Sequence, residues 1–345
     1  MENQMLDELE ETSHGLELQA AILHILDGRR HNIILSEQTL DLEEPSIEKY
    51  VKRYVTRAKK DMRTKPGTFL DTSSFLANLD PYFSNELSLP EFSAAVLKDL
   101  IHYFEHEEAR SFEVLLIDYR DDDVPYLSVI LLEEVDTLTY MTSSSHGQIL
   151  NTISFGHTSM PAVSKPVSSF ATINLLTKEI QFVDEGKWKD NGHLMKDILL
   201  EAEEGISRKE VVESVKTIAC EVAEEFHENP TVLLSKVKNY ISETVKEGMP
   251  LKTETLVSEV FEEQPKMKEV FLQKAEEQVL PKEVELPRAA VTAAMRKQRI
   301  KTDTGIEISF PAEYFQNNDF IEFVNHSDGT ITIEIKQINK ITNKL

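Results

Sequence analysis

Apolar residues recur every three or four positions between residues 46 and 65, the spacing that places side chains on one face of an α-helix. Ser46, which follows Pro45, can accept hydrogen bonds from the first free backbone N–H groups, and Pro66 with Gly67 interrupts the pattern. We therefore predict an amphipathic helix over this segment. Its apolar face consists of Ile47, Tyr50, Val51, Tyr54, Val55, Ala58 and Met62.

A second helix is indicated by a capping box, in which Ser88 and Glu91 stand three residues apart and Pro90 lies in the first turn. This helix is expected to continue through FSAAVLKDLIHYFEHE, residues 92–107. The earlier apolar segment LELQAAILHILD, residues 16–27, is short, and its pattern fits a strand or a helix.

Strand-like runs dominate the next part of the chain. FEVLLIDY and VPYLSVILLEE flank the acidic turn 120–123 and predict a hairpin. SSFATINLL and EIQFVDEG predict a second hairpin. Between the two hairpins, residues 142–169 are rich in Ser, Thr and Gly, and we expect loops there.

The pattern becomes helical after Gly186. Ser207 and Glu210 form a second capping box before an amphipathic run, and Asn229 with Pro230 begins another helix that ends at Gly248. The tail returns to strands, with IKTDTGIEISF, a helical turn at PAEYF, and a hairpin around Asp328-Gly329.

These elements predict an α+β fold, because the strands come as hairpins without regular helical crossovers. We expect a mixed domain over residues 1–185, in which helices pack on an antiparallel sheet. A helical domain over 186–287 follows, and then residues 288–345, which combine a basic segment with a terminal strand module.

Composition indicates a cytoplasmic globular protein. The chain has 345 residues, of which 40% are hydrophobic and 28% charged, with a single cysteine, Cys220, on an apolar helical stripe. No disulfide can form within it, the acidic N-terminus has no apolar export segment, and no run is long enough to span a membrane. We expect Cys220 to be a buried small hydrophobic residue.

Charge is distributed unevenly along the chain. The net charge is −24, which repels nucleic acid at long range, yet residues 46–65 hold eight bases and two acids and residues 288–301 hold five bases and no acid. Because salt screens charges beyond roughly 8–10 Å, such local segments can attract phosphate on an acidic body. The candidate nucleic-acid-binding residues are Lys49, Lys52, Arg53, Arg57, Lys59, Lys60, Arg63, Lys65, Arg296, Lys297, Arg299 and Lys301.

Each basic segment also has a structural explanation. The first is also typical of a solvated helix face that pairs with the protein's own acidic segments, although the few nearby acids at three- or four-residue spacing weaken the case for ion pairs within the helix. The second is equally a helix end or a tether between domains.

The sequence contains no motif that predicts catalysis, a metal or a cofactor. Asp303-Thr304-Gly305 matches the aspartic protease triplet, but it lacks a second copy and is typical of a turn. His102 and His106 have metal-ligand spacing without a third ligand, and phosphate-binding glycine loops and the GxSxG pattern are absent from the sequence.

The chain resembles the bacterial nucleoid-associated NdpA (YejK) family over nearly its whole length. The matching residues are AILHILD, GTFLDTSSF and the closing block GIEISFPAEYF…DFIEFVNHSDGTITIEI, whereas EIQFVDEGKW replaces the family's basic YLxFLKGR-like block. The resemblance implies an acidic cytoplasmic protein of the nucleoid that forms a homodimer and contacts DNA topoisomerases. It carries over no catalytic residue.

Three functions are compatible with these observations. The first is a nucleoid-associated protein that binds duplex DNA with little sequence preference through the basic segments. The second is a protein-interaction module that regulates a DNA-processing enzyme, such as a topoisomerase, without touching DNA. The third, a hydrolase in the strand-rich half, would need clustered titratable groups in a pocket.

Overall fold

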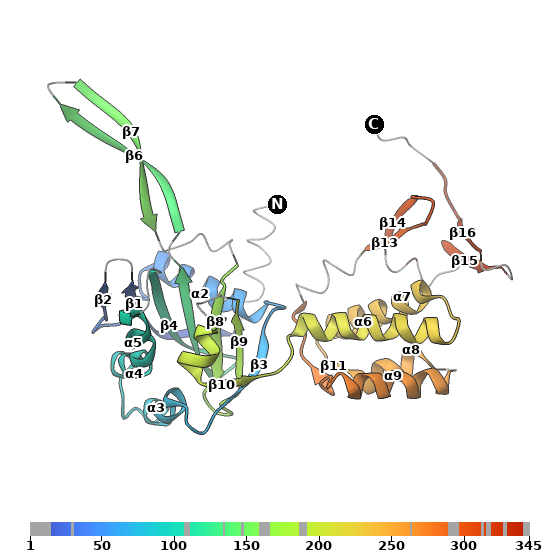
Figure 1. Cartoon of the computed structure of the whole chain (residues 1–345), viewed down its shortest axis with the longest axis horizontal. Coiled ribbons are helices and arrows are strands. Elements are labelled where there is room, and N and C mark those ends of the chain that lie inside the picture. The colour runs from blue at the N-terminus through green and yellow to red at the C-terminus, as the bar shows by residue number, and fades with distance from the viewer. Residues whose placement is uncertain are drawn as a thin grey trace. The chain divides into compact units, whose positions relative to one another are not determined.

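An antiparallel sheet of eight strands organises the N-terminal part of the computed structural model (Figure 1). The strand order is β10-β3-β9-β8-β5-β4-β1-β2, so sequence neighbours pair as hairpins, as predicted. The α+β class is confirmed. The strands are β1 (Leu16–Asp27), β2 (Asn32–Ile34), β3 (Lys65–Phe69), β4 (Ser111–Asp121), β5 (Val124–Glu133), β8 (Ser169–Asn174), β9 (Ile180–Asp184) and β10 (Ala202–Glu204).

The structure describes most of the chain, namely residues 15–28, 31–106, 111–133, 135–145, 148–158, 166–185, 192–262, 264–288, 297–311, 314, 319–326 and 330–340.

The chain forms two compact units. The first consists of Met1–Lys59 and Thr64–Gly205, and the second of Lys60–Arg63 and Ile206–Leu345. The change of pattern near residue 186 falls inside the first unit, because the π-helix η2 (Leu194–Leu200) packs in its core and β10 extends its sheet.

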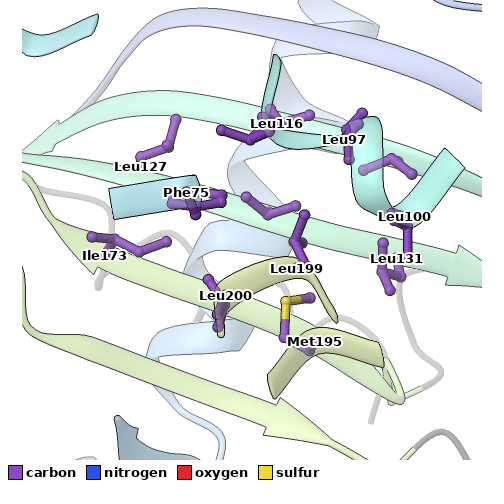
Figure 2. Packing of buried hydrophobic residues seen from close by; sticks show 14 of the residues in the cluster. Phe75, Leu97, Leu100, Leu116, Leu127, Leu131, Ile173, Met195, Leu199 and Leu200 are labelled. Carbon is purple, nitrogen blue, oxygen red and sulfur yellow. The ribbon is translucent and has the colours of Figure 1, made fainter. Parts of the chain in front are cut away.

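Three α-helices and η2 cover one face of the sheet. Figure 2 shows Phe75, Leu97 and Leu200 packed against Leu116 and Ile173 of the strands. The helices are α3 (Ser74–Phe83), α4 (Leu89–Val96) and α5 (Lys98–His106). The Ser88–Glu91 capping box begins α4, as predicted, but the expected continuous helix divides at Leu97 into α4 and α5.

Helix α2 (Pro45–Lys59) covers the opposite face. Its Val51, Tyr54 and Val55 pack on Leu115 and Ile117 of β4. Alternate residues of β4 therefore enter different cores, since Val114 and Leu116 lie in the core on the other face, with Phe75. A strand buried on both faces explains why FEVLLIDY is apolar almost throughout.

Helices build the core of the second unit. They are α6 (Arg208–Glu225), α7 (Pro230–Glu247), α8 (Thr253–Val260) and α9 (Pro265–Glu277), with the short pair β11 (Leu251–Lys252) and β12 (Glu283–Val284) beside them. The Ser207–Glu210 capping box and the Gly248 C-cap, at φ 73°, are both present as predicted. The tail forms two hairpins, β13 (Lys297–Lys301) with β14 (Glu307–Pro311) and β15 (Ile321–Asn325) with β16 (Ile331–Ile335).

A long two-stranded arm occupies the first part of the segment 142–169, where loops were expected. Strands β6 (Val135–Ser145) and β7 (Gln148–Thr158) pair along their whole length and project from the sheet (Figure 1). The loop prediction was wrong because Ser and Thr were counted as loop formers, whereas Thr favours strands when it alternates with Tyr and Ile. The undecided segment at residues 16–27 is strand β1. The turn expected at PAEYF lies outside the described residues, except for Pro311 and Tyr314.

None of the described helices is both long and apolar enough to cross a membrane.

A buried histidine joins the sheet to α4. The ring of His24, on β1, has no exposed surface; its Nδ1 accepts the Ser36 N–H at 3.0 Å and its Nε2 lies 2.9 Å from Ser93 Oγ. Since Nδ1 accepts, Nε2 carries the proton and donates to Ser93, whose hydroxyl donates to the Pro90 carbonyl. Burial lowers the pKa of His24 from 6.5 to about 4.

Stability is therefore expected to fall in acid. The unfolded chain binds a proton at residue 24 below pH 6.5 and the folded chain does so near pH 4, so lowering the pH through this window costs on the order of 2–3 kcal/mol. Urea unfolding from pH 7 to pH 4 measures this loss. His24→Asn should reduce the pH dependence, whereas His31→Asn, at an exposed site, should preserve it. Equal pH dependence in both variants would contradict the assignment.

Candidate nucleic-acid interface

Helix α2 is held firmly on its sheet side. Val51, Tyr54, Val55 and Ala58 are buried, and the hydroxyls of Tyr50 and Tyr54 are 2.9 Å apart. The rings of these two tyrosines meet edge to face with centroids 5.0 Å apart. Residues three or four positions apart share one face of a helix. Because the apolar face of α2 is buried against the sheet, the basic residues between the apolar positions point away from the sheet.

Three of the predicted basic residues form a row along α2. Lys49, Arg53 and Arg57 stand four residues apart, a rise of roughly 6 Å per step. Lys49 is exposed, while Arg53 and Arg57 are half-buried. Within the described part of the chain, Lys49 and Arg53 have no ion-pair partner. These two cations are thus the best placed on α2 to meet an external anion.

Neighbouring bases of α2 pair with acids of the protein itself. Lys52 Nζ lies 2.6 Å from Glu48 Oε1, one helical turn earlier, and Lys59 pairs with Asp121 at the end of β4. The expectation that α2 offers few acids at this spacing was wrong for Glu48, which stands four residues before Lys52. A pair as exposed as Lys52–Glu48 contributes roughly 0–1 kcal/mol, so a phosphate can compete for Lys52.

The last three bases of the first segment do not lie on the predicted helix face. Helix α2 ends at Lys59, Lys60 and Arg63 belong to the second unit, and Lys65 is in strand β3. The turn after Lys59 is stabilised by Asp61, which accepts the Arg63 backbone N–H at 2.9 Å and pairs with its guanidinium at 2.6 Å. Lys65 Nζ lies 3.2 Å from Glu204 Oε2.

Residues 297–301 of the second basic segment form strand β13, while residues 289–296 lie outside the described residues, so the helix end or tether stays an open alternative there. Lys297, Arg299 and Lys301 are alternate positions of β13, which pairs with β14. Lys301 Nζ lies 3.4 Å from Glu307 Oε1, and Arg296 lies outside the described residues, as do the side chains of Lys297 and Arg299. The two basic segments occupy different compact units, apart from Lys60 and Arg63.

The C-terminal end of α2 lies in an acidic setting. Asp121 begins the turn between β4 and β5, in which Asp122 and Asp123 adopt left-handed φ angles of 48° and 65°. A helix C-terminus also carries partial negative charge. Arg57 and Lys59, in the last turn, therefore stabilise the helix itself, whereas Lys49 and Arg53 have no such structural task in the described contacts.

The structure locates other features that the sequence singled out. Asp303-Thr304-Gly305 is the exposed turn between β13 and β14, with Gly305 at φ 88°, so the turn prediction is confirmed. Cys220 of α6 is half-buried rather than fully buried, and burial raises the pKa of its thiol. In the described residues, no group of three or more His, Cys, Asp or Glu side chains could hold a metal ion.

Sequence reasoning missed two features that bear on function. Asp121 is distant in sequence from Lys59, and the hairpin that brings them together was predicted without its position relative to α2. The β6–β7 arm was missed because its many Ser and Thr residues were taken to indicate loops. The signal for strands was the even spacing of apolar residues, which places them on one side of a strand. Leu138 and Tyr140 are two residues apart, and Ile149 and Ile153 are four apart.

Two comparisons with known proteins bear on identity. The family model described as nucleoid-associated protein YejK matches residues 22–342. A search of curated proteins finds no match.

The different roles of Lys59 and Lys49 in folding stability can be measured. We expect Lys59→Ala to lower the free energy of unfolding by about 0.5–1.5 kcal/mol, because it removes both the Asp121 pair and a favourable helix-end charge. Lys49→Ala should change stability by less than about 0.5 kcal/mol. Urea unfolding of both lysine variants measures these losses. A double-mutant cycle of Lys59→Ala with Asp121→Asn isolates the contribution of the ion pair. Equal losses for the two lysines would contradict the distinction.

Proposed function

The chain belongs to the nucleoid-associated protein YejK family, and from this we propose that it binds duplex DNA with low sequence specificity through local basic segments on an acidic body. The family assigns a nucleoid-associated role, and the protein is not proposed to be an enzyme. It acts in the cytoplasm, on the nucleoid.

The outward row of cations on α2 is the observation that carries this proposal. A helix anchored on one side by Val51, Tyr54 and Val55 presents Lys49 and Arg53 on the other with little loss of backbone freedom on binding. Lysine and arginine on a rigid helix contact phosphates and fix the position of a duplex without reading bases. This supports binding without sequence preference.

The net charge of −24 does not prevent this contact. At physiological salt, the field of distant acids is screened within roughly 8 Å, and a bound phosphate meets the nearest side chains first. Lys52 lies beside the row, and the Lys52–Glu48 pair is exposed enough for a phosphate to displace the carboxylate. The acidic remainder of the surface limits how many phosphates one protomer engages.

A second contact and a second protomer extend the binding surface in this proposal. The basic positions of the tail segment, Arg296, Lys297, Arg299 and Lys301, add phosphate contacts from the other unit. A homodimer doubles the contacts of both segments. Because each contact contributes to the same binding event, affinity rises steeply with the number of protomers engaged.

A second candidate function is a protein-interaction module that regulates a DNA-processing enzyme, such as a topoisomerase, without direct DNA contact. It is favoured by the pairing of Lys52, Lys59, Arg63 and Lys65 with acids of the chain itself, which leaves fewer cations available for phosphate. A strongly acidic surface suits a partner that normally binds DNA.

Salt-dependent binding tests the first function. The affinity of the full chain for a 30-base-pair duplex should fall with rising salt at a logarithmic slope near −0.9 per phosphate contact. The double variant Lys49→Gln, Arg53→Gln should bind more weakly and lower the slope by about 1.8. The matched control Lys98→Gln, Lys236→Gln removes two exposed bases elsewhere and should weaken binding less.

Two results would redirect the assignment. If both double variants bound equally well, α2 would not be the contact surface. If the intact protein bound no duplex at any ionic strength while a partner protein co-purified with it after nuclease treatment, the second function would replace the first.

A further inference from the structure

The β6–β7 arm has one apolar side. Residues directly opposite each other in an antiparallel pair point to the same side, and the register pairs Tyr140 with Ile153 and Ser144 with Ile149. Leu138 lies two residues before Tyr140 and shares that side. The same side also carries the hydrogen-bonded pair Thr142 and Asn151. The other side is more polar, since Met141 and Leu150 are its only large apolar residues among those whose side chains the structure describes.

This apolar side is exposed. The exposed fractions are 82% for Tyr140, 76% for Ile149, 73% for Ile153 and 65% for Leu138. Within the described elements, β6 and β7 make extensive contacts only with each other. A lone two-stranded hairpin is marginally stable in water, and large apolar side chains gathered on one face mark an interaction site.

Most of the arm also lacks charge. Residues 137–158 contain no Asp, Glu, Lys or Arg, although charged residues make up 28% of the chain. Exposed strand edges are usually protected by charged side chains, and this arm has none in that stretch. A surface that stays in water would not be expected to carry no charge along two strands except Asp136 at the start of β6.

The absence of charge identifies the kind of partner. A hairpin that wraps DNA needs cations for the phosphates, and one that binds a basic protein would carry acids. A second copy of this chain carries the same net charge of −24, so its closest approach is least opposed along the neutral arm. Two identical arms also satisfy the rule that a two-fold interface matches a surface to itself.

We infer that the apolar side of the β6–β7 arm is the self-association surface of this protein, where the arms of two copies pack against each other through Leu138, Tyr140, Ile149 and Ile153. The inference deepens the proposed function, because it assigns the surface of the proposed homodimer. It does not depend on DNA contact by α2.

The size of the arm sets the expected strength. Two strands of 11 residues present a flat face of roughly 35 Å by 10 Å. Two stacked arms therefore bury on the order of 700 Å² in total, without the additional area of the uneven side-chain surface. Stable specific interfaces bury about 1,200 Å² or more in total. The dimer is therefore expected to be reversible and visible as a concentration-dependent equilibrium.

Sedimentation equilibrium of the full chain over a wide concentration range tests the inference. The wild type should show a monomer–dimer equilibrium, and Tyr140→Glu with Ile153→Glu should raise the dissociation constant by about 100-fold or more, because it places four carboxylates in one apolar contact. The matched control is Ser143→Glu with Thr152→Glu, which adds the same charge to the opposite side of the same arm and should change the constant far less.

A second variant guards against simple misfolding of the arm. Strands β5 and β8 are paired neighbours in the main sheet, so a short Gly-Ser linker can replace residues 135–165. This variant should be monomeric while the urea midpoint of the remaining protein stays close to that of the wild type. A wild-type chain that is monomeric at all concentrations, or an arm-deleted chain that still dimerises, would overturn the inference.

Duplex binding measured on the same samples separates this inference from the DNA proposal. A monomeric Tyr140→Glu, Ile153→Glu variant should still bind DNA, with a shallower salt slope because fewer phosphates are engaged. If the wild type dimerises through the arm and binds no DNA, the inference stands and the DNA proposal fails. If the arm variants lose DNA affinity with an unchanged dimer constant, the arm contacts DNA and the inference fails.

Discussion

The sheet of the first unit is apolar on both faces, and covering both faces is the constraint that organises the protein. Leu116 and Leu131 need helices on one side, and Leu115 and Ile130 need a helix on the other. Burial of such side chains is worth roughly 1.5–3 kcal/mol each, more than any ion pair on the surface. Helix α2 meets the second demand, and its orientation about its own axis is therefore fixed by the core. The basic residues point outward because the apolar ones cannot.

This hierarchy of energies leaves basic residues of α2 available for the proposed contact. Lys49, Lys52 and Arg53 contribute little to folding, so their charges are available to select a partner at small cost in stability. The neighbouring acids do not cancel them, since an exposed carboxylate such as Glu48 holds a lysine weakly. Arg57 and Lys59 differ, because the end of the helix and the acidic turn at Asp121 give them a structural role. One helix thus carries cations of two kinds.

The sequence could predict features that depend on adjacent residues but not those that depend on contacts between distant parts of the chain. Local signals predicted the capping boxes at Ser88 and Ser207, the Gly248 helix end and the β4–β5 hairpin, because each depends on a few adjacent residues. The end of α2 was placed too late, since the apolar spacing continues to Met62, which packs instead in the helical core of the second unit. The pairing of Lys59 with Asp121 joins residues far apart in the chain, so no local pattern could predict it. The arm escaped because Thr and Ser suit both loops and strands.

Charge and its absence divide the surface into regions that cannot substitute for one another. Between Thr137 and Thr158 there is no formal charge, and on α2 a few cations stand above an apolar base, while most of the remaining chain, apart from the basic segment 288–301, is acidic. An acidic body repels both phosphate and other copies of itself, so any association must begin where that repulsion is relieved. Cations relieve it for a polyanion, and a neutral apolar surface relieves it for an identical acidic molecule. In both proposals, the negative charge outside these two regions restricts contact to a small part of the surface, which would make an unfavourable net charge a source of specificity.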